Sequence, residues 1–313
     1  MAGGGGFIGS HLVERLVRSG ALVRVLSRST EKVRWNLRDC LDRIELIQGD
    51  LSRLEDCVRS VRSQDAVFNL AGDVGGIGYN FNRHGITFLS NVSVNIVLLE
   101  AARLENVERY ECTSSTCVYS REKSLCAKEE DGFVGDPEPT VLGYGWAKRV
   151  AELQARFYAA DYGIKVAIVR PSNAYGPRDD FSPETSHVIP ALIRRVFESS
   201  NDITVWGSGR QTRSFVYVED VVRGIMDVTE RYAVADPINL GTQEEITIEE
   251  LVKLIIRLIG KNLRLRFDAS KPEGQPRKFA DISKAREKIG WKAEFALEDG
   301  LRKTISWYKD HAI

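Results

Sequence analysis

Cysteine, net charge and long apolar runs are all scarce in this sequence, and each shortage excludes a class of protein. The five cysteines are an odd number without CxxC spacing, so neither a disulfide framework nor a zinc site is expected. No apolar run reaches the roughly 20 residues that span a bilayer, and the N-terminus lacks the pattern of a signal peptide. We therefore expect a soluble, cytoplasmic protein with free thiols, no metal and no membrane partner.

The balance of charges also excludes a strong electrostatic field around the whole protein. Lys and Arg together number 44, and so do Asp and Glu, which gives a formal net charge of zero. Such a chain does not attract nucleic acid by its overall charge, so any anion site must be local. The length of 313 residues exceeds that of most single domains and predicts one large domain or two closely coupled ones.

Residues 1–170 alternate short β-rich apolar runs with longer helical patterns, which is typical of βαβ units. Helices are predicted at 10–18 and 87–104, where apolar residues recur on one face. The pattern predicts an α/β fold with a Rossmann-type doubly wound parallel sheet, and ligands bind at the carboxyl ends of such strands. The predicted strands are 21–27, 43–48, 65–71, 107–113 and 165–170.

After Pro171 the rhythm changes to loops punctuated by Gly and Pro, with helices predicted near 188–198 and 247–258. This change predicts a smaller mixed C-terminal lobe that binds substrate. We assign 1–172 to a dinucleotide-binding domain, to which 216–241 also contribute. The substrate-binding lobe then comprises 173–215 and 242–313.

Gly3, Gly6 and Gly9 form a GxxGxxG motif directly before the first helical pattern. Missing side chains let the backbone approach a pyrophosphate, and the helix N-terminus supplies donors to it. A flexible glycine-rich leader is the alternative for this motif taken alone. Only Met1 and Ala2 precede Gly3, where a strand is expected, so we expect the natural protein to extend a few apolar residues upstream.

Tyr144 and Lys148 are four residues apart in a helical run, so they share one face of the helix. A nearby ammonium lowers the pKa of a tyrosine and makes it a usable acid or base for a sugar hydroxyl or carbonyl. An isolated YxxxK is more often a core tyrosine beside a solvated lysine. The surrounding motifs at 69–72, 114–119 and 170–177 favour the catalytic interpretation.

In order and content these motifs resemble the extended short-chain dehydrogenases/reductases that act on nucleotide sugars, and the resemblance runs from Gly3 to the last predicted helix. Within that superfamily the sequence is most similar to the GDP-L-fucose synthases, with the GDP-mannose 3,5-epimerases close behind. The residues at 211–215 lean toward the mannose epimerases. The narrower resemblance rests on the segments 72–78, 115–117, 186–195, 206–215 and 272–278.

The resemblance implies that Ser115 and Tyr144 hold the sugar O4, that Lys148 orients the cofactor, and that Cys117 and His187 are the acid/base pair of epimerisation. The chemistry is consistent with this assignment. A carbonyl at C4 acidifies the hydrogens on C3 and C5, and inversion needs one group to remove a proton and another to return it. A thiol and an imidazole suit this near neutral pH, whereas a buried hydrophobic cysteine and a loop histidine are the alternatives.

The resemblance also implies binding residues. The substrate diphosphate is expected to contact Arg195, Arg213 and Lys278, because cationic side chains both attract phosphate groups and fix their position. Asn173 and Trp206 complete the expected substrate contacts. The expected cofactor contacts are Gly3, Gly6, Phe7, Ile8, Gly9, Arg28, Asp50, Leu51, Ala71, Gly72, Tyr144, Lys148, Pro171 and Asn173.

The cofactor is predicted to be NADP(H), with NAD(H) as the alternative. Enzymes that bind NAD usually carry Asp or Glu after the second strand, where this chain has Ser27, Arg28 and Ser29. The GDP-L-fucose synthases carry an arginine in the glycine loop, and this chain has Gly5 there. The mannose epimerases act with a lysine near the position of His187, and this chain has none at 187 or 188.

The predicted function is that of a nucleotide-sugar epimerase, a 3,5-epimerase of a 4-keto GDP-linked hexose with NADPH-dependent reduction at C4. An NAD-dependent 4-epimerase and a GDP-mannose 3,5-epimerase are the alternatives. A 4,6-dehydratase is disfavoured because Thr116 and Cys117 stand where dehydratases carry acidic residues. A catalytically silent regulatory protein is the alternative from another class. A homodimer through the long helices is also expected.

Overall fold

The alternating patterns of the N-terminal half form a parallel β-sheet in the computed structural model, which describes residues 1–123, 125–270 and 275–311. Its hydrogen-bonded neighbours follow the order β2, β1, Ala2, β3, β4, β6, β11, and every pairing is parallel. The predicted doubly wound sheet is confirmed, and each predicted strand forms. The strands are β1 (Val23–Ser27), β2 (Ile44–Gln48), β3 (Ala66–Asn69), β4 (Arg109–Thr113), β6 (Lys165–Pro171) and β11 (Ile238–Leu240).

Met1 and Ala2 lie between β1 and β3 at the centre of this sheet. The Ala2 amide donates to the carbonyl oxygen of Phe68 at 2.9 Å, and the Leu70 amide donates to that of Ala2 at 3.1 Å. On the other side, the Leu26 amide donates to the carbonyl oxygen of Met1 at 3.1 Å. These two residues therefore link the two halves of the sheet and lead directly into the glycine loop.

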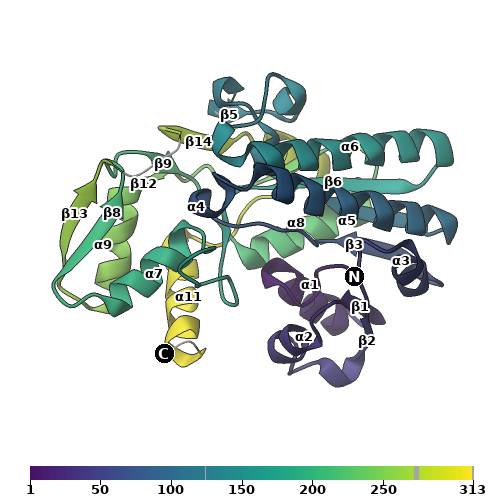
Figure 1. Cartoon of the computed structure of the whole chain (residues 1–313), viewed down its shortest axis with the longest axis horizontal. Coiled ribbons are helices and arrows are strands. Elements are labelled where there is room, and N and C mark those ends of the chain that lie inside the picture. Colours follow the sequence, from purple (N-terminus) through teal and green to yellow (C-terminus); the bar gives the residue numbers. More distant parts are fainter. Residues whose placement is uncertain (124, 271–274, 312–313) are drawn as a thin grey trace.

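Helices cover both faces of the sheet, as Figure 1 shows. Buried apolar residues of α1 and α2 pack with β1 on one face, where α8 packs against α1 and β6. On the other face α5 lies between α3 and α6. The chain leaves α6 at Gly163, whose φ of 71° suits the left-handed end of a helix. These helices are α1 (Phe7–Arg18), α2 (Thr30–Asn36), α3 (Leu54–Val61), α5 (His84–Leu104), α6 (Leu142–Tyr162) and α8 (Val218–Arg231).

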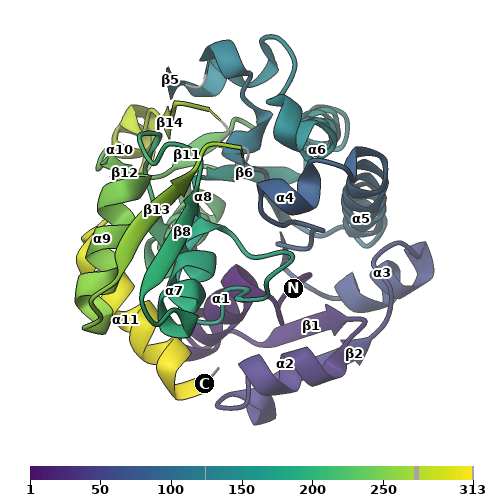
Figure 2. The same cartoon turned by 60° about the vertical axis from the view of Figure 1, so that its left-hand side comes forward.

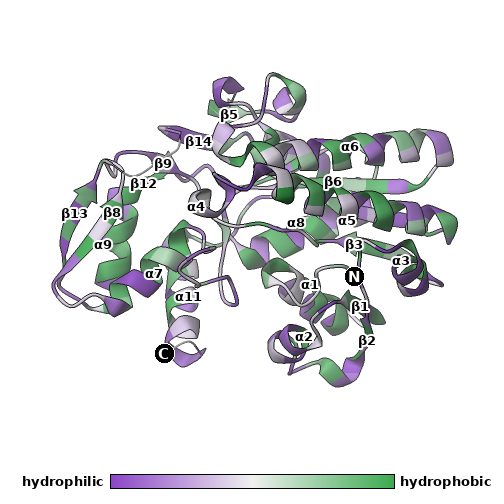
Figure 3. Cartoon of the chain, viewed as in Figure 1, coloured by the Kyte–Doolittle hydropathy of each residue, from purple (hydrophilic) through white to green (hydrophobic). Residues whose placement is uncertain are grey.

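Helix α5 corrects the expectation that no segment is long and apolar enough to cross a membrane. Its 21 residues contain an 18-residue window of mean hydropathy 1.5, which suffices by length and composition alone. Figure 3 shows its many apolar residues beside those of α6. Because α5 packs against α3, α6 and β3 and buries the amides of Asn91 and Asn95, its apolar character is that of a helix covering a sheet.

A smaller group of elements lies to one side of the sheet, as Figures 1 and 2 show, and all of its strands except β5 follow β6 in the chain. Short strands pair as β7 with β10, β8 with β13, and β12, β9, β14 and β5 in one sheet. Its strands are β5 (Leu125–Ala127), β7 (Ala174–Tyr175), β8 (Asp202–Trp206), β9 (Thr212–Arg213), β10 (Val216–Tyr217), β12 (Ile246–Thr247), β13 (Arg264–Asp268) and β14 (Arg277–Ala280).

The remaining helices include the two predicted C-terminal ones, α7 and α9. Both pack with α11 around a core of aliphatic and aromatic residues. The division into a dinucleotide-binding domain and a substrate lobe stays a prediction. The helices are α4 (Ile77–Asn80), α7 (Val188–Glu198), α9 (Ile248–Ile259), α10 (Ser283–Ile289) and α11 (Leu297–His311), with 3-10 turns η1 (Leu41–Arg43), η2 (Thr116–Val118), η3 (Arg121–Lys123), η4 (Glu129–Phe133) and η5 (Pro139–Val141).

Candidate active site

The glycine loop between Ala2 and α1 leaves room that side chains would fill. Gly3 has a φ of 73°, and a Cβ there would lie 2.6 Å from the carbonyl carbon of Leu70. A Cβ on Gly9 would collide with the carbonyl oxygen of Gly3. The Gly6 amide donates to that same oxygen at 2.9 Å, and α1 begins one residue later. A bare backbone turn before a helix N-terminus fits the pyrophosphate of a dinucleotide. Phe7 and Ile8 open that helix.

The loops that follow β1 and β2 meet at the same edge of the sheet. Arg28 is exposed directly after β1, and Asp50 follows β2. The amide and hydroxyl of Ser52 lower the pKa of Asp50, and the charge of Arg28 adds to this shift. Leu51 is partly buried beside this pair. The two side chains therefore lie at the carboxyl ends of β1 and β2, the edge of such sheets at which ligands bind.

Ser115, Tyr144 and Lys148 come together at the carboxyl end of β4. The amide of Cys117 donates to the Ser115 hydroxyl at 3.1 Å, which caps the 3-10 turn η2, and Ser115 also hydrogen-bonds Tyr144. Lys148, one turn after Tyr144 on α6, donates its Nζ to the carbonyl oxygen of Thr113 at 2.7 Å. Both α6 side chains are almost fully buried. The shared helix face that the sequence indicates is the face that packs on β4.

The structure corrects the expectation that Lys148 lowers the pKa of Tyr144. Burial raises the pKa of Tyr144 well above its ordinary value, a Cys117 thiolate would add to the rise, and the hydrogen bond with Ser115 opposes it. The Lys148 ammonium lies 5.5 Å from the centroid of the tyrosine ring and is bonded to Thr113. Burial also lowers the pKa of Lys148. Tyr144 is therefore a phenol that can donate a proton at neutral pH.

Cys117 lies beside a lysine from the C-terminal part of the chain. The Nζ of Lys278 is 3.8 Å from the Cys117 sulfur. Lys278 is on β14, in parallel register with Arg213 on β9, whose guanidinium donates to the carbonyl oxygens of Thr212 and Gln275 at 2.7 Å. Lys278 thus borders the thiol, and Arg213 lies on the neighbouring strand. Part of the predicted segment 272–278, residues 272–274, lies outside the described residues.

His187 is the residue that precedes α7, and its side chain is 42% exposed. Its Nδ1 is 4.0 Å from Oδ1 of Asp179, whose side chain is 3% exposed. Burial lowers the pKa of His187, but the carboxylate of Asp179, together with that of Asp180, outweighs burial and raises it above the ordinary value. The Gly76 amide donates to the carbonyl oxygen of Thr185 at 2.9 Å, so the loop 72–78 joins this region.

The N-terminal end of the same loop lies near Lys148. Ala71 is buried, and a Cβ on Gly72 would lie 3.9 Å from Nζ of Lys148. Near the loop's far end, a Cβ on Gly78 would lie 3.9 Å from the ring of Trp206, which is 45% exposed on β8. The loop therefore connects Lys148 with the neighbourhood of His187 and Trp206.

The remaining predicted binding residues are Pro171, Asn173 and Arg195. Pro171 ends β6, and its carbonyl oxygen accepts from Thr116 Oγ1 at 3.5 Å. Asn173 has a φ of 27° and donates its side-chain amide to the carbonyl oxygen of Ser214 at 2.9 Å. Arg195, in the last turn of α7, donates to the carbonyl oxygen of Thr204 on β8. This last contact holds Arg195 against β8.

Residues 1–241 match the NAD dependent epimerase/dehydratase family, and they include the glycine loop, Ser115, Tyr144 and Lys148. The chain belongs to the NAD-dependent epimerase/dehydratase family. The resemblance to extended short-chain dehydrogenases/reductases is thereby confirmed. This family comprises NAD(P)-dependent enzymes that epimerise, dehydrate or reduce nucleotide sugars, and nucleotide sugars are the substrates that membership implies.

Epimerase/dehydratase relatives match almost the whole chain. GDP-mannose 3,5-epimerase 1 of Oryza sativa subsp. indica is 31% identical over 314 residues, which cover 99% of this chain and 81% of that protein. GDP-L-fucose synthase of Escherichia coli (strain K12) is 33% identical over 325 residues, covering 99% of this chain and 96% of that protein. The structure of UDP-glucose 4-epimerase with UDP-glucose from Thermotoga maritima aligns with a TM-score of 0.89 and 26% identity, covering 100% of this chain and 98% of that one.

Sequence reasoning missed the buried groups that support this epimerase/dehydratase site. Arg170 on β6 forms an ion pair with Glu152 on α6 at 2.6 Å, and Glu152 also accepts from Ser114. The neighbouring Arg149 donates to the carbonyl oxygen of Val118 at 2.7 Å and so holds the turn that carries Cys117. The sequence did contain a signal for this buried network: Glu152 follows Lys148 by four residues and so lies on the same inner face of α6.

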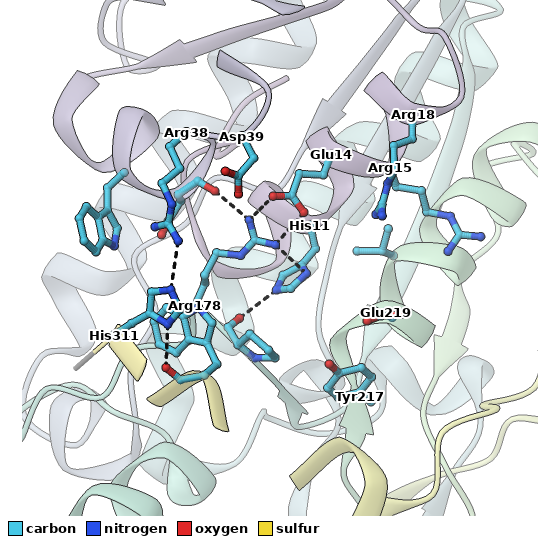
Figure 4. A pocket seen from close by; sticks show the side chains of 15 residues that line it. His11, Glu14, Arg15, Arg18, Arg38, Asp39, Arg178, Tyr217, Glu219 and His311 are labelled. Carbon is cyan, nitrogen blue, oxygen red and sulfur yellow. Dashed lines mark hydrogen bonds and ion pairs between the residues drawn. The ribbon is translucent and has the colours of Figure 1, made fainter. Parts of the chain in front are cut away.

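A separate polar cavity of about 380 Å³ lies between α1, α2 and the end of α11 on one side and the loop after β7 on the other. Figure 4 shows Arg178 at its centre, with Glu14 and His11 of α1 within reach. Neither Tyr144 nor His187 lines this cavity. It therefore lies apart from these two residues.

Proposed function

We propose that the protein is a 3,5-epimerase of a 4-keto GDP-linked hexose that also reduces the product at C4 with NADPH. The observation that carries this proposal is the position of Cys117. Its amide donates to the Ser115 hydroxyl, which in turn hydrogen-bonds Tyr144, so the thiol is next to the pair that would hold the sugar O4. A partly exposed thiol at this point can exchange a proton with a carbon next to C4.

In this proposal Cys117 and His187 transfer the protons at C3 and C5. Cys117, whose sulfur lies 3.8 Å from the Nζ of Lys278, is proposed as the base that removes a proton. Asp179 favours the protonated imidazole of His187, which is the form that can return one. A base and an acid are thus provided by different elements of the fold.

Reduction at C4 needs a proton donor at O4. Tyr144 suits this role because burial keeps its hydroxyl protonated at neutral pH. Ser115 would hold the same oxygen by a hydrogen bond. When bound, NADPH supplies the hydride, and we propose that Arg28 recognises its 2′-phosphate. Arg195, Arg213, Lys278, Asn173 and Trp206 remain proposed substrate contacts.

A GDP-mannose 3,5-epimerase, which restores the C4 hydroxyl without net reduction, is the second candidate. Two observations favour it: the relative from rice is 31% identical over 99% of this chain, and the segment 211–215 resembles the mannose epimerases. This candidate uses the same Cys117 and His187 chemistry. The two differ in whether NADPH is consumed, which the absorbance of NADPH at 340 nm measures directly.

We also propose a homodimer formed through α5 and α6. Apolar side chains on the outer sides of these helices are unusually exposed for their size. Residues i and i+7, or i and i+4, lie on the same helix face, so these side chains form two adjacent stripes. Light scattering measures the mass of the particle in solution. The stripes comprise Leu89 (60% exposed) and Ile96 (41%) on α5, and Trp146 (38%), Leu153 (36%) and Phe157 (60%) on α6.

The proposed function is tested by solvent exchange. The enzyme is incubated in D₂O with NADP(H) and a panel of GDP-, UDP-, CDP- and dTDP-linked sugars and their 4-keto forms, and products are analysed by mass and NMR. Deuterium should enter C3, C5 or both. Cys117→Ser and His187→Asn should each lower the exchange rate by about 10²–10⁴ while cofactor binding is retained, because each removes a general acid or base.

Cys126→Ser is the matched control, since Cys126 is an exposed thiol outside the proposed site. It should exchange deuterium at the wild-type rate. Turnover of a sugar by the wild-type enzyme with no deuterium at C3 or C5 would refute the proposal. The chain would then be a simple 4-epimerase or reductase.

A further inference from the structure

Asp179 is a buried carboxylate with few partners. Its Oδ1 accepts from the Asp180 amide at 2.8 Å and lies 4.0 Å from Nδ1 of His187. Its Oδ2 is fully enclosed and has no hydrogen-bond partner among the described residues. Burying a carboxylate is costly unless a charge or hydrogen bond compensates for it. His187 is the cation placed to compensate for this burial.

His187 in turn needs a negative neighbour. It occupies the position before the first residue of α7, where the partial positive charge of the helix N-terminus disfavours a cation. The first turn of α7 contains no acidic residue. The charged groups that act on His187 are Asp179 and Asp180, since the facing loop at Gly75 and Gly76 carries no charge. Asp179 therefore offsets the effect of the helix on the imidazole.

The carboxylate of Asp179 is anchored through the residue before it. Arg178 adopts a φ of 67° and donates to both carboxylate oxygens of Glu14, at 2.7 and 2.9 Å. It also donates to the carbonyl oxygen of Asn36 at 2.8 Å, and the Asn36 side chain donates to that of Gly5 at 2.9 Å. Figure 4 shows these contacts of Arg178. The backbone that carries Asp179 is thus fixed to the helix that follows the glycine loop.

We propose that Asp179 is the positioning residue of His187: it orients the imidazole through Nδ1 and leaves Nε2 to face the sugar. This proposal rests on the proposed function for what the Nε2 proton does. Neither the sequence motifs nor the family match assigns a role to Asp179. Because Arg178 holds the same backbone to α1 and α2, the orientation of His187 also depends on contacts with the glycine loop.

The experiment is an NMR pH titration of the full-length protein labelled with ¹⁵N-histidine, which has only four histidines. The His187 signal is assigned from the spectrum of His187→Asn. In the wild-type protein the pKa of His187 should lie above 6.5, and Asp179→Asn should lower it by about one pH unit or more, because an opposite charge at this distance is removed. A wild-type pKa at or below 6.5, or no change in Asp179→Asn, overturns the proposal.

Asp227→Asn is the control, because Asp227 is an aspartate on α8 that pairs with Arg231 at 2.8 Å. It should leave the His187 titration unchanged. The wild-type titration alone decides the proposal if Asp179→Asn does not fold. The titration does not require turnover, so it can support the role of Asp179 even if deuterium exchange refutes the proposed epimerisation.

The rate profile gives a second readout. A histidine that donates a proton is active below its pKa, so the rate of exchange falls as pH rises through that value. Because Asp179→Asn lowers the pKa of His187, the decrease in exchange rate at high pH, the basic limb of the profile, should move to lower pH by the same amount as in the titration. A purely structural role would lower the rate at all pH values without moving the limb, and that result would also overturn the proposal.

Discussion

The proposed cofactor side and the proposed sugar side of this site are built in different ways. On the cofactor side, Gly3, Tyr144 and Lys148 come from a tight loop and from one face of the 21-residue helix α6. On the sugar side, Cys117, His187 and Lys278 come from a 3-10 turn, the residue before α7 and the short strand β14. The comparison teaches that local periodicity positions the first group, whereas pairing between distant segments positions the second.

The two sides meet over a buried polar network. Arg170 on β6 binds Glu152 on α6, and its Nη1 also donates to the Tyr119 hydroxyl at 2.9 Å, just beyond the turn that carries Cys117. Tyr119 in turn donates to Asn239 on β11 at 2.6 Å. The sheet therefore supports the sugar side through charged and hydrogen-bonded groups as well as through apolar packing.

The largest expected effect tests whether the cofactor side carries the chemistry at O4. Tyr144→Phe should lower kcat for reduction or epimerisation by about 10²–10⁴, because it removes the buried proton donor. Steady-state kinetics with the sugar identified by the panel provide the measurement. Tyr162→Phe, an exposed tyrosine on the same helix, is the control and should change kcat little. If Tyr144→Phe kept a near wild-type kcat, the proton donor would have to be a residue of the sugar side.

The next effect tests the network between the two sides. Glu152→Gln should lower the free energy of unfolding by about 3–5 kcal/mol, because the buried guanidinium of Arg170 loses its counter-charge. Urea denaturation measures this change. Glu298→Gln breaks ion pairs with Arg257 and Arg302 on the surface and should change the free energy of unfolding much less, because solvent screens exposed pairs. Equal losses in both variants would contradict the importance of the buried pair.

The smallest effect concerns the outer edge of the cofactor side. Arg28→Ala should weaken NADPH binding about tenfold or more and leave NADH binding nearly unchanged, because one charge-assisted contact to the 2′-phosphate is lost. Fluorescence titration with both cofactors is the measurement, and Arg53→Ala, an exposed arginine beside Glu55, is the control. Tighter binding of NADH than of NADPH by the wild-type protein would show that the cofactor prediction is wrong.

Much of the cofactor side could be predicted because its signals are short-range. The glycine spacing, the four-residue step from Tyr144 to Lys148 and the order of strands are all visible along the chain. The protonation of Tyr144 could not be predicted, since it depends on burial and on Lys148 turning to Thr113. Sequence spacing gives the face of a helix, but the direction of a pKa shift depends on what packs against that face.

The sequence by itself determined the alternation of strands and helices, the glycine loop and the helix face of Tyr144 and Lys148, because each follows from backbone geometry over a few residues. Only the tertiary structure decided that Lys278 approaches Cys117 across 161 positions, that Asp179 faces His187, and that Arg178 fixes this loop to α1. Such contacts depend on the parallel register of β9 and β14 and on the fold of a buried loop. No local pattern encodes them, because the segments meet only when the sheet and the second lobe have formed.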